Sequence, residues 1–239
     1  MQKIIEIKKN WPDDRLLIHY SLHNVCNYKC WYCFPGANEG TYRWPDLELT
    51  LNNLKHLLHT YQDKFDKRVF ELNLLGGEPT LWPRLDEFIK GLKDEFGDKI
   101  IICMTTNGSR TLSWWKNNAK YFDKILISCH PETVDAAHIS AVADLLYKSR
   151  VYVDVTVLMD PTRWDTCLGI INSLKQSRHR WSIQTSQLVG ITETYTVEQE
   201  KYLKNYMKRW PNPYWLWKCT KHFNYKTTVI NDQGKSKKS

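Results

Sequence analysis

The sequence lacks any hydrophobic run long enough to cross a bilayer, and its first residues, MQKIIEIKKN, lack the apolar stretch of a secretory signal. It also has no internal repeat, no low-complexity segment and no second pair of closely spaced cysteines. The first absence argues against a membrane protein, and the last argues against a zinc ribbon or finger. We therefore expect a cytoplasmic protein.

Composition is that of an ordinary globular chain. The 239 residues are 42% hydrophobic and 25% charged, which suits one α/β domain with a well-filled core. The net charge of +8 is partly terminal, with basic residues at Lys8, Lys9, Lys235, Lys237 and Lys238. We expect this charge to serve solubility and not nucleic-acid binding. Among the eleven tryptophans, those such as Trp114 with Trp115 could act as stacking platforms, although such residues are more often core and interface anchors.

Cysteine is concentrated in one short stretch. Of seven cysteines, three lie in CNYKCWYC, at Cys26, Cys30 and Cys33. An odd, clustered set indicates a metal site in a reducing compartment and not a disulfide framework. Zinc would need a fourth ligand, for which His23 or Cys219 is available. An iron–sulfur cubane held by three cysteines leaves one iron open to a substrate or cofactor.

Strand patterns and helix patterns alternate along the chain. Strands are predicted at residues 16–22, 69–75, 99–104, 124–129, 151–158 and 181–188. Helices are predicted at residues 51–61 (with Thr50 as N-cap), 85–96, 113–121, 132–148, 163–177 and 197–209. Such alternation predicts a parallel sheet with right-handed crossovers, either a partial (β/α)6 barrel or an open doubly wound sheet.

Polar and glycine-rich stretches follow the first four predicted strands. The cysteines follow the first strand, GGEP (76–79) the second, TTNG (105–108) the third and SCHPE (128–132) the fourth. In both candidate architectures ligands bind at the carboxyl ends of the strands. We therefore expect these stretches to form one site.

The spacing CxxxCxxC with an aromatic residue before the last cysteine, followed by GGEP and six strand–helix units, resembles the radical S-adenosylmethionine (radical SAM) superfamily. The resemblance covers residues 16–210, and the whole chain looks most like short radical SAM cores of large tailed phages. It implies a partial (β/α)6 barrel in which Cys26, Cys30 and Cys33 hold a [4Fe–4S] cluster. S-adenosylmethionine would bind the open iron and be cleaved to a 5′-deoxyadenosyl radical that abstracts hydrogen from substrate.

The resemblance also implies cofactor-binding residues. Tyr32 matches the aromatic position whose backbone lies along the adenine. Gly76 and Gly77 would let the backbone approach the methionine part of the cofactor, and Glu78 would meet its ammonium group.

Further cofactor residues are implied after the next two strands. Thr106 and Asn107 would point into the barrel mouth, and Ser128 matches a position that binds the ribose. On the residues alone, Asn107-Gly108 is equally compatible with an ordinary turn.

Candidates for chemistry on the substrate follow the fourth strand. His130 and Glu132 could act as acid, base or hydrogen-bond donor, although a histidine before proline is often a satisfied loop residue. Cys129 could donate a hydrogen atom, but buried cysteines more often behave as small hydrophobes.

The facing of the fifth predicted strand stays open. Either Asp154 and Thr156 or Val153 and Val155 could point inward, because both faces of a barrel strand are buried.

The chain is expected to divide into an N-terminal segment (1–15), a core domain (16–210), and a C-terminal wrap with a flexible basic tail (211–239). Beyond residue 167 only Cys219 is available, too few for an auxiliary cluster. The sixth strand lacks a clean adenine motif, with residues 189–191 the nearest candidate. The insertion at residues 34–46 is expected to roof the substrate site.

Several readings of the substrate remain open, and it could be a small molecule or a peptide. The chain resembles 7-carboxy-7-deazaguanine synthases in size and in GGEP, viperin-like nucleotide dehydratases in NYKCWYCF, and glycyl-radical activases in its cysteine spacing. An external electron donor such as flavodoxin or ferredoxin is implied. A non-enzymatic, metal-bearing nucleic-acid-binding module is the alternative from a different class.

Overall fold

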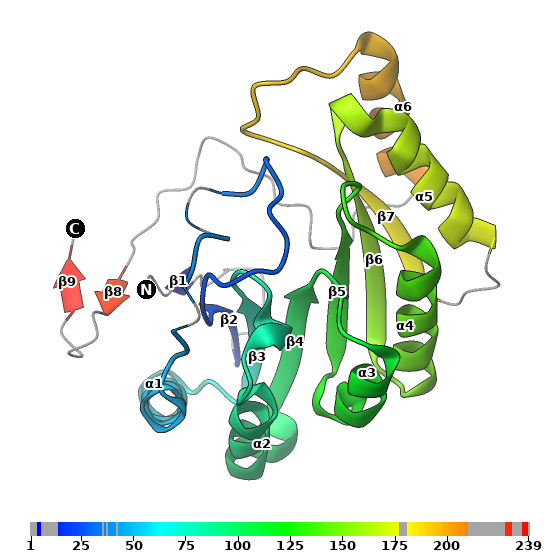
Figure 1. Cartoon of the computed structure of the whole chain (residues 1–239). Helices are drawn as coiled ribbons and strands as arrows, with labels where there is room; N and C mark the ends of the chain where they lie inside the picture. The colour runs from blue at the N-terminus through cyan, green and yellow to red at the C-terminus, as the bar shows by residue number, and fades with distance from the viewer. Residues whose placement is uncertain are drawn as a thin grey trace.

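The computed structural model describes residues 4–5, 14–34, 36, 38–41, 43–176, 181–209, 228–230 and 236–238. One sheet has the strand order β1-β2-β3-β4-β5-β6-β7, and a separate antiparallel pair joins β8 to β9 (Figure 1). The strands are β1 (Ile4–Ile5), β2 (Arg15–Ser21), β3 (Val69–Leu75), β4 (Ile100–Thr106), β5 (Lys124–Cys129), β6 (Tyr152–Met159), β7 (Ser182–Gln187), β8 (Thr228–Ile230) and β9 (Ser236–Lys238).

A helix follows each of the parallel strands, and all but the last of these helices connect one parallel strand to the next. The helices are α1 (Leu47–Phe65), α2 (Leu85–Phe96), α3 (Leu112–Asn118), α4 (Ala136–Lys148), α5 (Trp164–Gln176) and α6 (Val197–Arg209), with 3-10 turns η1 (Pro79–Leu81), η2 (Gly97–Lys99), η3 (Ala119–Tyr121) and η4 (Pro161–Arg163). None of the helices in the described ranges combines the length and apolarity that a membrane span requires.

The sheet is a partial barrel, as predicted. Strands β2 to β7 pair in parallel, each with the next one in the chain. Among the described strands, β7 pairs only with β6, so the barrel is open. β1, which the sequence analysis did not predict, adds an antiparallel strand at the other edge. β8 and β9 lie where an irregular wrap and tail were expected, while the rest of that predicted segment, including Cys219, lies outside the described residues.

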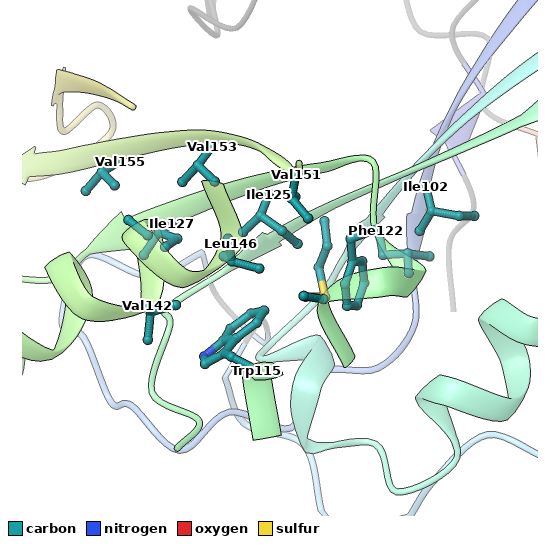
Figure 2. Close-up of a cluster of buried hydrophobic side chains, with 14 of the residues drawn as sticks. Ile102, Trp115, Phe122, Ile125, Ile127, Val142, Leu146, Val151, Val153 and Val155 are labelled. Carbon is teal, nitrogen blue, oxygen red and sulfur yellow. The ribbon is translucent and has the colours of Figure 1, made fainter. Parts of the chain in front are cut away.

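The hydrophobic core lies between the sheet and its outer helices. Alternate residues of strands β2 to β6 face this layer, and Val153 and Val155 of β6 belong to it. Asp154 and Thr156 therefore point to the opposite, concave face, which settles the facing left open by the sequence. Figure 2 shows this part of the core, with labels on Ile102, Trp115, Phe122, Ile125, Ile127, Val142, Leu146, Val151, Val153 and Val155.

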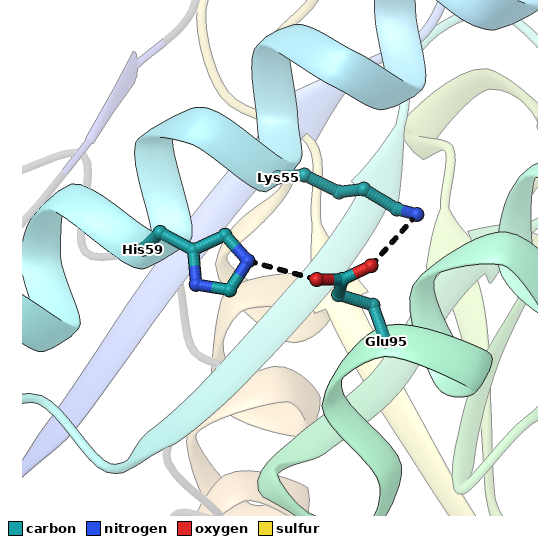
Figure 3. Close-up of polar contacts among 3 residues, drawn as sticks. All are labelled: Lys55, His59 and Glu95. Atoms are coloured by element: carbon teal, nitrogen blue, oxygen red, sulfur yellow. Dashed lines mark hydrogen bonds and ion pairs between the residues drawn. The ribbon is translucent and has the colours of Figure 1, made fainter.

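Helix α1 begins one turn earlier than predicted. The Asp46 side chain accepts a hydrogen bond from the Leu49 amide at 2.8 Å, so Asp46 is the N-cap and the predicted cap, Thr50, is a buried residue inside the helix. α1 also contacts α2 through Glu95, which pairs with Lys55 at 3.1 Å and His59 at 3.0 Å (Figure 3). This exposed network links the two helices but contributes little stability.

Helix α4 begins later than predicted. The predicted start near Glu132 is occupied by a turn, in which the Thr133 and Val134 amides donate to the His130 carbonyl. The helix starts at Ala136, because the Asp135 side chain caps it by accepting from the Ala137 and His138 amides. This turn keeps His130 close to the carboxyl end of β5.

Candidate metal centre

The segment between β2 and α1, residues 22–46, carries the three clustered cysteines and is called the cysteine loop below. It lies at the edge of the sheet toward which the arrow of β4 points (Figure 1). Cys26, Cys30 and Cys33 line a pocket of about 200 Å³. The rest of its lining includes Gly76 and Gly77 after β3, Thr105, Thr106 and Asn107 at the end of β4, and Ser128 and His130 at the end of β5. The structure thus brings together at one edge the stretches that the sequence predicted would meet.

The glycine pair lets the turn after β3 pack against the cysteine loop. The Gly77 amide donates to the His23 carbonyl and the Glu78 amide to the Val25 carbonyl, both at 2.8 Å. A Cβ on Gly76 would lie 2.2 Å from the His23 oxygen, and one on Gly77 would lie 2.1 Å from the Val25 oxygen. Any residue other than glycine at these two positions would clash with the backbone of the cysteine loop unless that backbone moved. The glycines therefore place the loop and also expose their own backbone to the pocket.

Glu78 is buried behind the pocket wall. Its carboxylate accepts hydrogen bonds from the Thr80 hydroxyl at 2.6 Å, the Thr106 hydroxyl at 2.7 Å and the Asn107 amide at 2.7 Å. Burial raises the pKa of Glu78, and these hydrogen bonds oppose the rise. The carboxylate thus joins the ends of β3 and β4, and its predicted contact with the cofactor ammonium stays a prediction.

The end of β4 holds the cysteine loop through amide side chains. The Asn107 side chain donates to Asn27 at 2.9 Å, and the Asn27 side chain donates to the Ser109 hydroxyl at 3.0 Å. The Thr106 hydroxyl donates to Glu78 and accepts from the Gly108 amide, so its hydrogen bonds are made within the turn. Thr106 also lines the pocket. Sequence reasoning missed Asn27 and Ser109, because an asparagine in a loop has no pattern that names its partner.

Two further contacts fix the loop, and sequence reasoning missed both. The Gly40 amide donates to the Asn24 carbonyl at 2.9 Å and closes the loop on itself. The Trp31 indole donates to Asp160 at 3.1 Å, and Asp160 is fully buried at the end of β6. Asp160 follows a strand and precedes a proline, and this pattern does mark a turn. Its second carboxylate oxygen, however, accepts the hydrogen bond from Trp31, which lies 129 positions away in the sequence.

His130 contacts the cysteine loop directly. Its Nδ1 lies 3.2 Å from Cys30 Sγ and 3.1 Å from the Tyr32 hydroxyl. The Tyr32 side chain thus packs on His130 outside the described lining of the pocket, and the predicted role of its backbone along adenine stays a prediction. Glu132 lies near Cys30 and contributes to raising the pKa of that thiol, after the larger effect of burial.

Two of the other groups considered from sequence, Cys129 and His23, are not among the residues that line the pocket. Cys129 is fully buried in the core on the helix-facing side of β5, which does not suit hydrogen-atom donation into the site. His23 packs edge-on against Trp44 and its Nδ1 accepts from the Val25 amide at 3.2 Å. Ser128 does line the pocket, as its predicted ribose contact requires.

The donor set fits an iron–sulfur cluster. Three thiols face one pocket, and burial raises the pKa of each, for Cys30 to about 12. Binding to cationic iron would supply the charge that stabilises the thiolates. Within the described part of the chain, no three Cys, His, Asp or Glu side chains converge on one point as a single ion requires. A cubane has a different requirement, since each cysteine binds a different iron.

An open parallel barrel with a three-thiol pocket at the carboxyl ends of its strands defines an α/β protein built to hold a metal group. The chain belongs to the radical SAM superfamily, because the model of that family matches residues 20–159, more than half of the chain. This match confirms the resemblance seen in the sequence. Enzymes of this superfamily use a [4Fe–4S] cluster and S-adenosylmethionine.

Curated relatives share part of this chain. A GTP 3′,8-cyclase of Corynebacterium glutamicum is 38% identical over 96 residues, covering 38% of this chain and 24% of the relative. A GTP 3′,8-cyclase of Helicobacter pylori (strain J99) is 32% identical over 188 residues, covering 79% of this chain and 52% of the relative. The chain therefore spans between a quarter and about half of the length of these relatives.

Solved structures share the fold. Native anSMEcpe with bound AdoMet matches with a TM-score of 0.60 at 19% identity, covering 82% of this chain and 60% of that one. Streptococcus suis SuiB matches with a TM-score of 0.51 at 17% identity, covering 82% of this chain and 47% of that one. These likenesses confirm the predicted partial (β/α)6 barrel.

Proposed function

We propose that this chain is a radical SAM enzyme whose cluster is held by Cys26, Cys30 and Cys33. The observation that supports this most is the convergence of these thiols with the glycine turn after β3 on one pocket, in a chain of this superfamily. When bound, the cluster and S-adenosylmethionine would supply a 5′-deoxyadenosyl radical that takes a hydrogen atom from substrate.

The residues of this chain would bind and orient the cofactor. Gly76 and Gly77 present backbone groups beside the cysteines, where the methionine part would lie. Ser128 offers a hydroxyl from the neighbouring β5, suited to a sugar hydroxyl. Glu78 would set the electrostatics of the amine site from behind the wall, through Thr106 and the Asn107 amide.

The proposal stops at the shared chemistry and does not name a substrate. The names of the relatives point to GTP, whereas a solved neighbour carries a bound peptide, so the common element is use of the cofactor. We further propose an external one-electron donor such as flavodoxin or ferredoxin, and a cytoplasmic location, which would protect a cluster of this kind.

The test is anaerobic reconstitution of the full chain with iron and sulfide. After reduction with dithionite and addition of S-adenosylmethionine, 5′-deoxyadenosine is measured by chromatography. We expect about four irons per chain and cofactor cleavage in the wild type. Cys26→Ser should abolish both.

Cys167→Ser is the matched control, because this buried thiol donates to the Leu158 carbonyl in the core and is not among the residues that line the pocket. It should load iron and cleave the cofactor as the wild type does. A wild-type chain that binds no cluster, or a Cys26→Ser variant that still cleaves the cofactor, would contradict the proposal.

A further inference from the structure

The end of β5 holds one imidazole in a fixed orientation against the cysteine loop. The His130 ring is stacked on Tyr32, with centroids 6.0 Å apart and an interplanar angle of 2°. It also meets Tyr28 edge-on, with centroids 5.7 Å apart and an angle of 79°. Contacts with two tyrosines of the loop therefore hold the plane of the ring that carries Nδ1.

That nitrogen points at a cysteine sulfur. His130 Nδ1 lies 3.2 Å from Cys30 Sγ, well within range for a hydrogen bond to sulfur. A cysteine that binds iron is a thiolate and carries no hydrogen. A hydrogen bond between the two atoms then requires the hydrogen to be on Nδ1, which makes His130 the donor.

The nearby Tyr32 hydroxyl is compatible with this arrangement. Its oxygen lies 3.1 Å from the same Nδ1, so it can share the imidazole N–H as a second acceptor. Its own hydrogen is then free to point at the thiolate. The sulfur can therefore receive a hydrogen bond while His130 is a neutral imidazole and Tyr32 a neutral phenol.

We propose that His130 donates its Nδ1–H to the Cys30 thiolate and thereby raises the reduction potential of the [4Fe–4S] cluster. This inference rests on the proposed function, since it requires Cys30 to be a cluster ligand. Reduction adds one electron, and a donor to a ligand sulfur stabilises the added negative charge. His130 is then a positioning and tuning residue of the cluster, a different role from the substrate acid or base that the sequence indicated.

The test is an anaerobic redox titration of the reconstituted full chain without S-adenosylmethionine. Dithionite supplies the electron, and EPR of the reduced cluster gives the midpoint potential. His130→Phe keeps a stacking ring but removes the donor, so its midpoint should shift to a more negative value at unchanged iron content. His130→Asn restores an N–H near the position of Nδ1 and should return the midpoint toward that of the wild type.

His59→Phe, which changes an exposed histidine on α1, is the matched control and should leave the midpoint unchanged. A role in packing alone would leave the midpoint of a fully loaded His130→Phe protein equal to that of the wild type, and that result would overturn the inference. A wild type that holds no [4Fe–4S] cluster would overturn the proposed function together with it.

If His130→Phe does not load iron, the wild type labelled with ¹⁵N-histidine gives the same information. Pulsed EPR of its reduced cluster should detect a weak histidine nitrogen coupling, transmitted through the N–H to sulfur bond. A loaded wild type without such a coupling would overturn the inference while leaving the proposed function intact.

Discussion

At the residue scale, Gly77 has the tightest surroundings of the site. Gly77→Ala would put a Cβ 2.1 Å from the Val25 oxygen, and neither backbone can yield without moving the cysteine loop. We expect the free energy of unfolding of the apoprotein to fall by about 2 kcal/mol. Chemical denaturation measures this, and the iron content after reconstitution should fall with it.

Gly169→Ala is the matched control. Gly169 lies on the exposed side of α5 with no atom within 4 Å of an added Cβ. Alanine there should raise the stability by about 0.5–1 kcal/mol, because it favours the helix. Equal effects of the two substitutions would mean that the close approach at Gly77 does not constrain the loop.

His23 is a second residue with a measurable consequence, through pH. Burial lowers its pKa to about 4, and its Nδ1 is occupied by the Val25 amide. Between about pH 6.5 and pH 4 the unfolded chain binds a proton that the folded chain refuses, so stability falls as the pH decreases. His23 should account for about 2 kcal/mol of lost stability at about pH 5.

The measurement compares apoprotein unfolding at about pH 7.5 and about pH 5. His23→Asn keeps an acceptor for the Val25 amide but does not titrate, so its loss of stability should be smaller than that of the wild type. His56→Asn, on an exposed side of α1, should lose as much as the wild type. A His23→Asn variant with the full wild-type loss would show that another group is responsible.

The candidate site was predictable to the extent that its residues follow strands. Strand ends gather at one edge, so the cysteines, Gly76, Gly77, Asn107 and Ser128 could be assigned to one pocket from the sequence. The partners of Glu78 and His130 could not, because side-chain hydrogen bonds depend on distances across the sheet that no local pattern encodes.

At the element scale, strongly patterned segments were predicted best. The bounds of β3, α2, β5 and α6 agree with the sequence prediction, because each has a clear apolar period and defined ends. The starts of α1 and α4 were wrong, since each depends on which of several polar residues caps the helix. β1 was missed because its two residues form a strand only by pairing with β2.

The facing of β6 is the element-scale feature that only packing could determine, and it gives a reciprocal test. Val155 is fully buried in the core of Figure 2, whereas Thr156 lies half-buried on the concave face. Val155→Thr should destabilise the chain by about 1–3 kcal/mol, because the hydroxyl would be buried among apolar groups. Thr156→Val should change the stability by no more than about 0.5 kcal/mol.

Thermal or chemical unfolding of the two variants measures these changes in free energy. Both swap the same two side chains of nearly equal volume, so each serves as the control for the other. A larger loss from Thr156→Val than from Val155→Thr would reverse the assigned faces of the strand.

At the scale of the whole molecule, the cysteine loop is tied to four successive strands. It bonds to the turn after β3 through the Gly77 amide, to the end of β4 through Asn107, to the end of β5 through His130 and to the end of β6 through Asp160. A loop held at only one strand would move with that strand. Because the loop is bonded to four strands, the position of the cysteines is fixed by the barrel as a whole.

The tie farthest from β2 tests this view. Trp31→Phe keeps an aromatic ring but removes the indole N–H, which leaves one oxygen of the buried Asp160 without that donor. We expect the free energy of unfolding to fall by about 1–3 kcal/mol. Hydrogen–deuterium exchange should speed up in two places, residues 24–34 and the start of η4, because the contact joins them. Trp114→Phe, on the half-buried face of α3, should leave exchange at both places unchanged. Faster exchange in the loop alone would mean that the end of β6 is ordered without the loop, and that the barrel holds its cysteines through fewer strands.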